Sequence, residues 1–347
     1  MHALEGVRVL DLSRLVPGPY ATMLLADLGA EVVKIEEPAQ GDYLRGWPPA
    51  YRATNAAFCM LNRGKKSATL NLKSDEGRRR FLELARRADV VVESWRPGVA
   101  DRLGVGWEAV RAANPRVVYC SIFGGDDTPG HDLNYLGVTG VLDGMDGLPS
   151  VLIADIGGGA MTAVFAILAA LFARERGGGG QRVDVSMIEA IRSWMFFPGA
   201  HFFAGEETPR PLPLAGGLPI YGIYVTKDGK RITLAALEPK FAAALGVDAF
   251  DREAVAALMR SRTRDEWLAR RDLPVAPVLT VEEALRGHVV WVDDPAEGRV
   301  ANLPFPVRFS GTPARAPSRS PSLGEHTKEV LGLSDAEEAR LRAEGVI

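Results

Sequence analysis

The chain has 347 residues, of which 47% are hydrophobic, 41 are basic and 44 are acidic, giving a formal net charge of −3. This length and hydrophobic content are enough for a large domain with a sizeable core and a smaller second domain. The small net charge and the lack of a long block of like charge argue against nucleic acid as a partner. The two cysteines, Cys59 and Cys120, lack the spacing of a zinc site and predict reduced core residues in a cytoplasmic protein.

The N-terminal residues and the longest apolar run bear on targeting. A strand-like segment begins at residue 7, so we expect no signal peptide, which would first need a basic region, an apolar stretch and a cleavage site. The apolar run 160–173 is shorter than the roughly 20 residues that span a bilayer. We therefore expect a buried helix there and no membrane partner.

The first 125 residues alternate between short β-branched runs and amphipathic stretches. The expected strands are residues 7–12, 31–35, 67–72, 90–93 and 117–122. The expected helices between them include residues 21–28, 74–87 and 107–113, the second with Ser74 as its N-cap. Such alternation predicts an α/β fold whose large, Rossmann-like domain has a parallel sheet with flanking helices.

The residues that follow the expected strands are polar or basic. They are Ser13 and Arg14, Glu36 and Glu37, Lys73, Ser94–Arg96, and Gly124–His131. Because ligands bind outside the carboxyl ends of parallel strands, these residues predict a ligand-binding wall along one edge of the sheet.

The second half of the chain predicts a smaller α+β domain between two proline-rich connectors. A long helix (159–176) ends in four glycines and is followed by a strand (182–186) and a further apolar helix. The later elements are a hairpin (221–237), a helix (252–270), an extended segment (275–279) and a terminal helix (334–344). The expected domain limits are 1–190 and 310–347 for the large domain, 191–219 and 300–309 for the linkers, and 220–299 for the small domain.

His131 and Asp155 are the first candidates for acid–base chemistry. His131 lies beside Asp132 in a polar, glycine-containing loop, although a surface turn would have the same neighbours. Asp155 follows the apolar run 151–154 and precedes three glycines and an apolar helix, so we expect a strand, a carboxylate and then a helix N-terminus. Free N–H groups there would stabilise an oxyanion, while a plain N-cap role for Asp155 is the alternative.

Other motifs are less specific. The glycines 157–159 lack the G-x-G-x-x-G spacing and follow the fifth strand, so a nicotinamide cofactor is disfavoured. Arg96 lies just beyond a strand end, where it would bind a phosphate while Trp95 offers an aromatic face. The alternative is that both residues simply belong to a turn built by Pro97. Glu238, before Pro239, would not attract attention alone.

Taken together, motifs along nearly the whole chain resemble those of one family. They are Val9–Ser13 with Pro17–Pro19, Leu28–Glu36, Asn71–Ser74, Arg96–Gly98 with Leu103–Gly104, Gly130–Asp132 with Asn134–Tyr135, and Ala154–Asp155 with Gly157–Gly159. By these residues the chain resembles the class III CoA-transferase (CaiB/BaiF) family, and within it the α-methylacyl-CoA racemases of lipid metabolism.

The resemblance implies an interlocked homodimer with the active site between the large domain of one subunit and the small domain of its mate. It also implies a coenzyme A site on the strand-end wall. The matching residues are Leu70, Asn71, Leu72, Lys73, Ser94, Trp95, Arg96, Pro97, Gly98, Arg102, Gly130 and Tyr135.

The same resemblance implies the chemistry. One residue of the pair His131 and Asp155 would remove the α-proton of a 2-methylacyl-CoA, and the other would deliver a proton to the opposite face, with backbone donors at Gly157–Met161. Glu238 matches a carboxylate that orients the histidine, and Asp132 a neighbour that raises the pKa of the aspartate. No metal or redox cofactor is expected, since coenzyme A is part of the substrate.

Two alternatives remain open. CoA-transferases of this fold use the aspartate at the Asp155 position as a nucleophile and usually lack the histidine, so His131 favours the isomerase. The second alternative is a CoA-binding homologue without turnover, because two features of the sequence depart from the family pattern. Glu37 stands where an arginine often meets the ribose phosphate, which leaves Arg14, Lys65 or Lys66 for that contact. The loop between Ser121 and His131 is also several residues shorter than usual.

Overall fold

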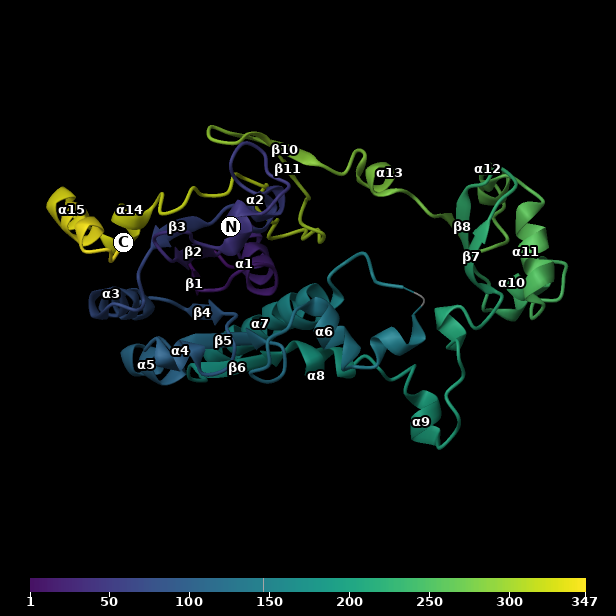
Figure 1. Ribbon diagram of the computed structural model, residues 1–347, viewed down its shortest axis with the longest axis horizontal. Helices are drawn as coiled ribbons and strands as arrows, with labels where there is room; N and C mark the ends of the chain where they lie inside the picture. Colours follow the sequence, from purple (N-terminus) through teal and green to yellow (C-terminus); the bar gives the residue numbers. More distant parts are fainter. Residues whose placement is uncertain (146) are drawn as a thin grey trace. The chain divides into compact units, whose positions relative to one another are not determined.

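The computed structural model describes residues 1–145 and 147–347, which form two compact units. Unit 1 comprises Met1–Thr139, Pro149–Arg192 and Val289–Ile347, and unit 2 comprises Gly140–Leu148 and Ser193–His288 (Figure 1). Residues 289–299, which the sequence assigned to the small domain, thus belong to unit 1. The reason is a hairpin of β10 (Val290–Asp294) and β11 (Gly298–Asn302), in which Glu297 accepts hydrogen bonds from the N–H groups of Arg52 (2.9 Å) and Ala53 (3.0 Å).

Unit 1 is built on a six-stranded sheet in the order β3-β2-β1-β4-β5-β6. Its strands are β1 (Arg8–Asp11), β2 (Glu31–Glu36), β3 (Lys66–Thr69), β4 (Val90–Glu93), β5 (Val118–Phe123) and β6 (Gln181–Ser186). Every neighbouring pair is parallel. The predicted α/β fold with a Rossmann-like parallel sheet is confirmed.

Helices cover both faces of this sheet. On one face, α3 (Asp75–Ala85), α5 (Trp107–Ala113) and the residues around α15 (Asp335–Ala343) close a core that includes Leu10, Val33 and Phe81. On the other face, α1 (Pro17–Asp27) packs on β1, β2 and β4, while α7 (Thr162–Glu175) packs on β5 and β6. α14 (Thr327–Leu331) lies beside β3 at the sheet edge (Figure 1).

Shorter helices complete unit 1. They are η1 (Tyr43–Gly46), α2 (Ala56–Leu61), α4 (Val99–Arg102), α6 (Asp132–Gly137) and α8 (Met187–Arg192). The predicted N-cap of α3 is confirmed, because Ser74 Oγ accepts a hydrogen bond from Gly77 N–H at 3.0 Å.

The expected strand at residues 151–154 is wrong. Residues Ile153–Met161 form a π-helix, η3, that continues into α7. The continuous segment Ile153–Glu175 is, by length and composition alone, long and apolar enough to cross a membrane. A core helix has the same composition, and here Ala163, Ile167 and Ala170 are buried while Phe165 and Phe172 are exposed.

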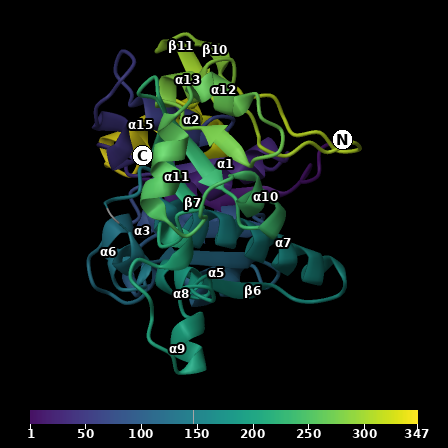
Figure 2. The same cartoon turned by 90° about the vertical axis from the view of Figure 1, so that its right-hand side faces the viewer.

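Unit 2 contains a three-stranded antiparallel sheet of β7 (Tyr221–Val225), β8 (Arg231–Ala235) and β9 (Val275–Pro277), which confirms the expected hairpin. The single expected helix 252–270 is two helices, α11 (Arg252–Arg260) and α12 (Arg264–Leu268), because Thr263 and Glu266 form a capping box that starts a new helix. α11 runs along β7 (Figure 2). The remaining elements are η2 (Val141–Gly144), α9 (Ala200–Ala204), η4 (Pro213–Ala215), α10 (Pro239–Ala244) and α13 (Val281–Leu285).

Candidate active site

β1 and β4 are neighbours at the centre of the sheet, where the strand order reverses. In parallel sheets this switch point opens a crevice for ligands at the carboxyl ends of the strands. Here the loops after β1 and β4 are tied together, because Arg14 N–H donates to Ser94 Oγ at 3.1 Å. Two parts of the predicted wall therefore meet at the position where the fold favours a ligand.

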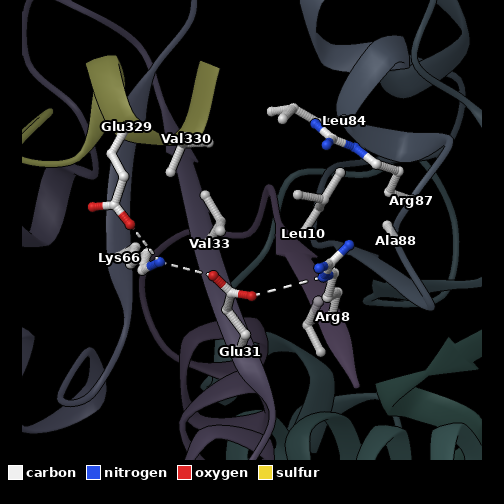
Figure 3. A pocket seen from close by; sticks show the side chains of 11 residues that line it. Arg8, Leu10, Glu31, Val33, Lys66, Leu84, Arg87, Ala88, Glu329 and Val330 are labelled. Atoms are coloured by element: carbon white, nitrogen blue, oxygen red, sulfur yellow. Dashed lines mark hydrogen bonds and ion pairs between the residues drawn. The ribbon is translucent and has the colours of Figure 1, made fainter. Parts of the chain in front are cut away.

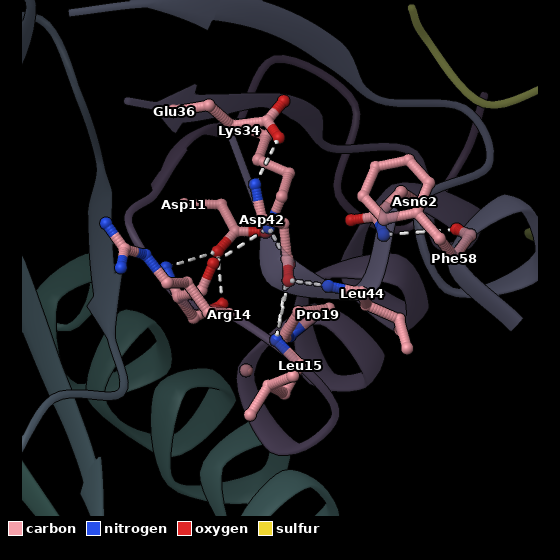
Figure 4. A network of polar contacts seen from close by, with 12 residues as sticks. Asp11, Arg14, Leu15, Pro19, Lys34, Glu36, Asp42, Leu44, Phe58 and Asn62 are labelled. Atoms are coloured by element: carbon pink, nitrogen blue, oxygen red, sulfur yellow. Dashed lines mark hydrogen bonds and ion pairs between the residues drawn. The ribbon is translucent and has the colours of Figure 1, made fainter. Parts of the chain in front are cut away.

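A buried ionic network fixes the loop after β1 (Figure 4). Lys65 Nζ is fully buried and contacts Asp11 Oδ2 at 3.0 Å, while Lys34 Nζ contacts Asp42 Oδ2 at 3.0 Å and Ser13 O at 2.8 Å. Burial alone raises the pKa of Asp11, but the two lysines hold it below its usual range. The loop takes its shape from these charges.

The buried ionic network constrains the backbone conformation of Leu15. Its φ of 61° lies in the left-handed region, which a leucine rarely adopts. The Asp42 carboxylate accepts a hydrogen bond from Leu15 N–H at 3.1 Å and thereby fixes this conformation (Figure 4). The backbone beside Arg14 is consequently preorganised.

The expectation that Lys65 or Lys66 grips a phosphate is wrong. Lys65 is committed to the buried network, where burial lowers its pKa to about 8 against the pull of Asp11. Lys66 starts β3 at the opposite, amino edge of the sheet, and its Nζ lies 2.8 Å from both Glu31 and Glu329 in a separate pocket (Figure 3).

Arg14 is the candidate that remains near the carboxyl edge. Its Nη1 donates to Tyr43 Oη at 2.7 Å, and its guanidinium carbon lies 4.9 Å from the centre of the Tyr43 ring. Glu37 does not oppose it as a free carboxylate, because the N–H groups of Gln40 and Ala39 donate to Glu37 and lower its pKa.

The loop after β4 carries five of the expected coenzyme A contacts. Trp95 N–H donates to Glu93 Oε2 at 2.7 Å, and the exposed Arg96 donates through Nη1 to Asp127 O at 3.3 Å. Gly98 precedes α4 with a φ of 79°, and a Cβ added to it would lie 3.3 Å from Arg102 Nη1. Arg102 is therefore beside the loop, as expected for a shared surface.

The loop after β3 is held by the C-terminal residues. Asn71 N–H donates to Val346 O at 2.7 Å, and Asn71 Nδ2 donates to Gly345 O at 3.1 Å. Lys73 is exposed, and Leu72 packs partly against the core. Leu70 is 1% exposed, so its side chain belongs to the core and only its backbone is available to a ligand.

His131, Asp132 and Tyr135 lie together around the start of α6. His131 is exposed and precedes the helix, with its N–H donating to Asn134 Oδ1 at 3.0 Å. Tyr135 Oη donates to Gly130 O at 2.7 Å. A Cβ at Gly130 would come within 2.7 Å of the Tyr135 ring, so a larger residue there would have to displace this ring.

Asp155 lies in the first turn of η3. Its N–H donates to Asp132 Oδ1 at 2.9 Å, and its own carboxylate has no hydrogen-bond partner among residues 1–145 and 147–347. Burial, reinforced by the negative charge of Asp132, raises the pKa of Asp155 to about 7. The N-cap role is therefore wrong, and Asp155 is a half-buried carboxyl that exchanges its proton near neutral pH.

Two of the glycines after Asp155, Gly158 and Gly159, lie where η3 packs closely against other parts of the chain. A Cβ at Gly158 would lie 3.0 Å from Met187 O, and one at Gly159 would lie 3.0 Å from Pro17 Cβ. N–H groups within a π-helix donate to carbonyls five residues earlier, so the glycine N–H groups serve η3 itself. The expectation that Gly157–Met161 present free donors is wrong for this conformation.

Glu238 belongs to unit 2, where it precedes α10, and its carbonyl accepts hydrogen bonds from the N–H groups of Phe241 and Ala242. Its side chain is exposed. A role beside His131 stays a prediction. Glu93 was not among the residues predicted from the sequence. Its position after three valines, at the end of a buried strand, was a signal that could have identified it.

The fold and this edge define a Rossmann-like α/β protein in which a buried carboxyl group, Asp132, and a half-buried one, Asp155, lie next to a histidine-bearing loop that follows β5. The chain belongs to CoA-transferase family III, whose family model matches residues 4–327. It is 34% identical to the α-methylacyl-CoA racemase of Mus musculus, over 99% of this chain and 97% of that protein.

CoA-transferases are equally similar. The formyl-CoA:oxalate CoA-transferase of Streptomyces avermitilis is 34% identical, over 99% of both chains, and the succinyl-CoA:glutarate CoA-transferase of Mus musculus is 31% identical, over 100% of this chain and 91% of that protein. The crystal structure of a CAIB/BAIF family protein from Brucella suis matches with a TM-score of 0.79 and 29% identity, covering 99% of this chain and 100% of that one. These relatives include both a racemase and transferases.

Proposed function

We propose that this protein racemises 2-methylacyl-CoA thioesters by removing and returning the α-proton through an enolate. The observation that carries the proposal is Asp155, a carboxyl without a hydrogen-bond partner among the described residues and with a pKa raised to about 7, next to Asp132 and the loop of His131. A base whose pKa is near the working pH is the most effective in proton transfer.

The exchange needs two groups that flank one carbon. His131 directly precedes Asp132, and Asp132 accepts a hydrogen bond from the backbone N–H of Asp155, so the chain segments that carry the two candidates are in contact. In the proposal, one of them takes the α-proton and the other returns a proton to the opposite face. The carbon between them loses its configuration, and no atom is consumed.

A CoA-transferase is the second candidate, and it is favoured by the Asp155 carboxylate, which has no hydrogen-bond partner in the part of the chain that the structure describes. An oxygen of Asp155 would attack the thioester carbonyl, form an acyl anhydride and release coenzyme A as its thiolate. The thiolate would then attack the aspartyl carbonyl, form an aspartyl-CoA thioester and release the donor carboxylate. The acceptor carboxylate would attack this thioester, form a second anhydride and release the thiolate, which would attack the acceptor's acyl carbonyl, form the new acyl-CoA and free Asp155. His131 has no necessary part in this route, so its substitution separates the two candidates.

The proposal extends to the surroundings of the pair. We infer that the loops 70–73 and 94–98, with Arg102, Gly130 and Tyr135, bind coenzyme A in a cytoplasmic homodimer without a cofactor. Their position at the carboxyl ends of the strands supports this inference, and Arg14 joins them. Glu238 of a second chain would orient His131.

Proton NMR in deuterated water tests the proposal, with each epimer of short, long and aromatic 2-methylacyl-CoA substrates. We expect the α-proton signal to disappear and both epimers to form, and both effects to be lost in His131→Ala and Asp155→Ala. Transfer of coenzyme A to a free carboxylate, with a covalent adduct on Asp155 and full activity in His131→Ala, would decide for the transferase. Coenzyme A binding without exchange or transfer would leave a binding protein.

A further inference from the structure

Glu93 is a buried carboxylate that the proposed chemistry does not use. It ends β4, 4% exposed, and its two oxygens accept hydrogen bonds from different partners. Oε2 accepts from Trp95 N–H at 2.7 Å, and Oε1 accepts from the hydroxyl of Ser121 on β5. Glu93 thereby joins the sheet to the first residues of the loop 94–98.

Packing does little to hold the outer part of this loop. Arg96, Pro97 and Gly98 are exposed, and a cavity of about 170 Å³ lies beneath Pro97 and Gly98. Glu93 and Ser121 line this cavity, with Trp107 and Tyr119. The position of the loop therefore depends on polar contacts: Glu93 with Trp95, Ser94 with Arg14, and Arg96 with Asp127.

We propose that Glu93 is a positioning residue for coenzyme A, whose ionised carboxylate fixes the loop 94–98 and whose protonation loosens it. This inference rests on the proposed function for the assignment of that loop to coenzyme A. A hydrogen bond to a charged acceptor is roughly twice as strong as one to a neutral acceptor. Protonated Glu93 still accepts from Trp95 but donates to Ser121 instead, so the loop keeps its shape and loses stiffness.

The groups that face Glu93 determine the pH of this change. From β5 they are Ser121, Tyr119 and Cys120, and from β6 they are Arg182 and Asp184, whose side chains pair at 2.8 Å. Asp101 of α4 lines the same cavity. Burial raises the pKa of Glu93 to about 7, while the bonds from Ser121 and Trp95 and the charge of Arg182 lower it and Asp184 raises it.

Tyr119 and Cys120 do not compete for this proton. Burial and then the charge of Glu93 raise the pKa of each far above neutral, so both remain uncharged. The carboxylate of Glu93 is thus the group of this cavity wall that changes charge in the range of the proposed reaction.

Glu93→Gln separates charge from shape. The glutamine oxygen accepts from Trp95 and its amide donates to Ser121, so the loop contacts persist without the charge and without a proton to exchange. Calorimetric titration with free coenzyme A, from pH 5.5 to pH 8.5, measures the dissociation constant without needing turnover. Since both proteins meet the same coenzyme, the ionisation of its phosphates cancels in the ratio of the two constants.

We expect Glu93→Gln to bind coenzyme A about three- to tenfold more weakly than the native protein at pH 8.5, and equally well at pH 5.5. Asp184→Asn, at a half-exposed position, should move the midpoint of the native pH dependence to lower pH. In turnover assays Glu93→Gln should raise KM at high pH and leave kcat unchanged, which a general loss of folding would not do.

Two results would overturn the inference. A ratio of dissociation constants that does not change with pH would show that protonation of Glu93 does not control coenzyme A binding, and would leave the proposed function intact. Absence of coenzyme A binding to the native protein at every pH would overturn the inference and the proposed function together. Hydrogen exchange of the peptide that contains Trp95 tests the loosening without ligand. The measured rate at each pH is divided by the intrinsic rate at that pH. If this ratio is not larger at pH 5.5 than at pH 8.5, the loop does not loosen when Glu93 is protonated.

Discussion

Asp132 Oδ1 accepts the backbone N–H of Asp155 at 2.9 Å, so one carboxylate holds the other in place and also raises its pKa. The two effects are separable, because the first needs only an oxygen and the second needs a charge. Burial is the larger cause of the raised pKa of Asp155, and the charge of Asp132 adds to it.

Asp132→Asn should therefore lower the pKa of Asp155 while keeping its position. The asparagine oxygen still accepts from Asp155 N–H, but the negative charge is gone. Since ionisation of Asp155 sets the pH midpoint of α-proton exchange in the proposed reaction, we expect this midpoint to lie at lower pH in Asp132→Asn than in the native protein. Exchange rates measured from pH 5 to pH 9 check this. A midpoint that stays in place would show that Asp132 does not tune Asp155, and Asp132→Ala, which loses both effects, serves as the comparison.

Asp155 should also make stability depend on pH. Its pKa of about 7 in the folded protein lies above the ordinary value of 3.8, so the folded state binds the proton more tightly. The contribution of Asp155 to the free energy of unfolding is fully present below about pH 4 and is lost as the pH rises through 7. Asp155→Asn has no proton to lose, so its Tm should exceed the native one by about 2–5 °C at pH 8, with a smaller difference at pH 5.

Scanning calorimetry of the two proteins at both pH values measures this difference. Glu93, whose pKa is raised in the same way, contributes equally to both proteins and cancels in the comparison. A native protein that is more stable than Asp155→Asn at pH 8 would contradict the raised pKa.

The strands and their parallel order were predictable from the sequence, and the conformation around Asp155 was not. Runs such as 90–93 consist of β-branched residues bounded by polar ones, and the parallel order follows from their alternation with helices. Residues 151–154 have the same apolar character, yet a short apolar run fits a buried helix as well as a strand. The close approach of η3 to Met187 and Pro17, far apart in sequence, decides between them.

Lys65 and Lys66 show a second limit. They are adjacent and chemically identical, so composition gave no reason to separate them. Lys65 is buried in the network with Asp11, whereas Lys66 is about a third exposed between two glutamates. Which lysine is buried depends on the helix and strand that pack around it, and therefore on tertiary contacts.

The same pair offers a matched test of the ionic network. Lys65→Met leaves Asp11 buried with only one of its two lysines, and breaking a buried ion pair costs about 3–5 kcal/mol. Lys66→Met removes two partly exposed ion pairs, to Glu31 and Glu329, and each costs about 0–1 kcal/mol. Urea unfolding at pH 7 measures both free energies of unfolding. Equal losses in the two variants would mean that the network does not stabilise the loop after β1.

The glycines of η3 give the last prediction. A Cβ at Gly159 would lie 3.0 Å from Pro17 Cβ and 3.1 Å from Met187 Cγ, so η3 must move away from α1 and α8 to accept Gly159→Ala. Overpacking of this kind costs about 1–3 kcal/mol. Since Asp155 lies in the same turn of helix, the shift should also lengthen its bond to Asp132 and reduce exchange of the α-proton. Gly179→Ala, where nothing lies within 4 Å, is the matched control and should change neither quantity. If Gly159→Ala loses stability but keeps full exchange activity, the packing of η3 and the position of Asp155 are independent.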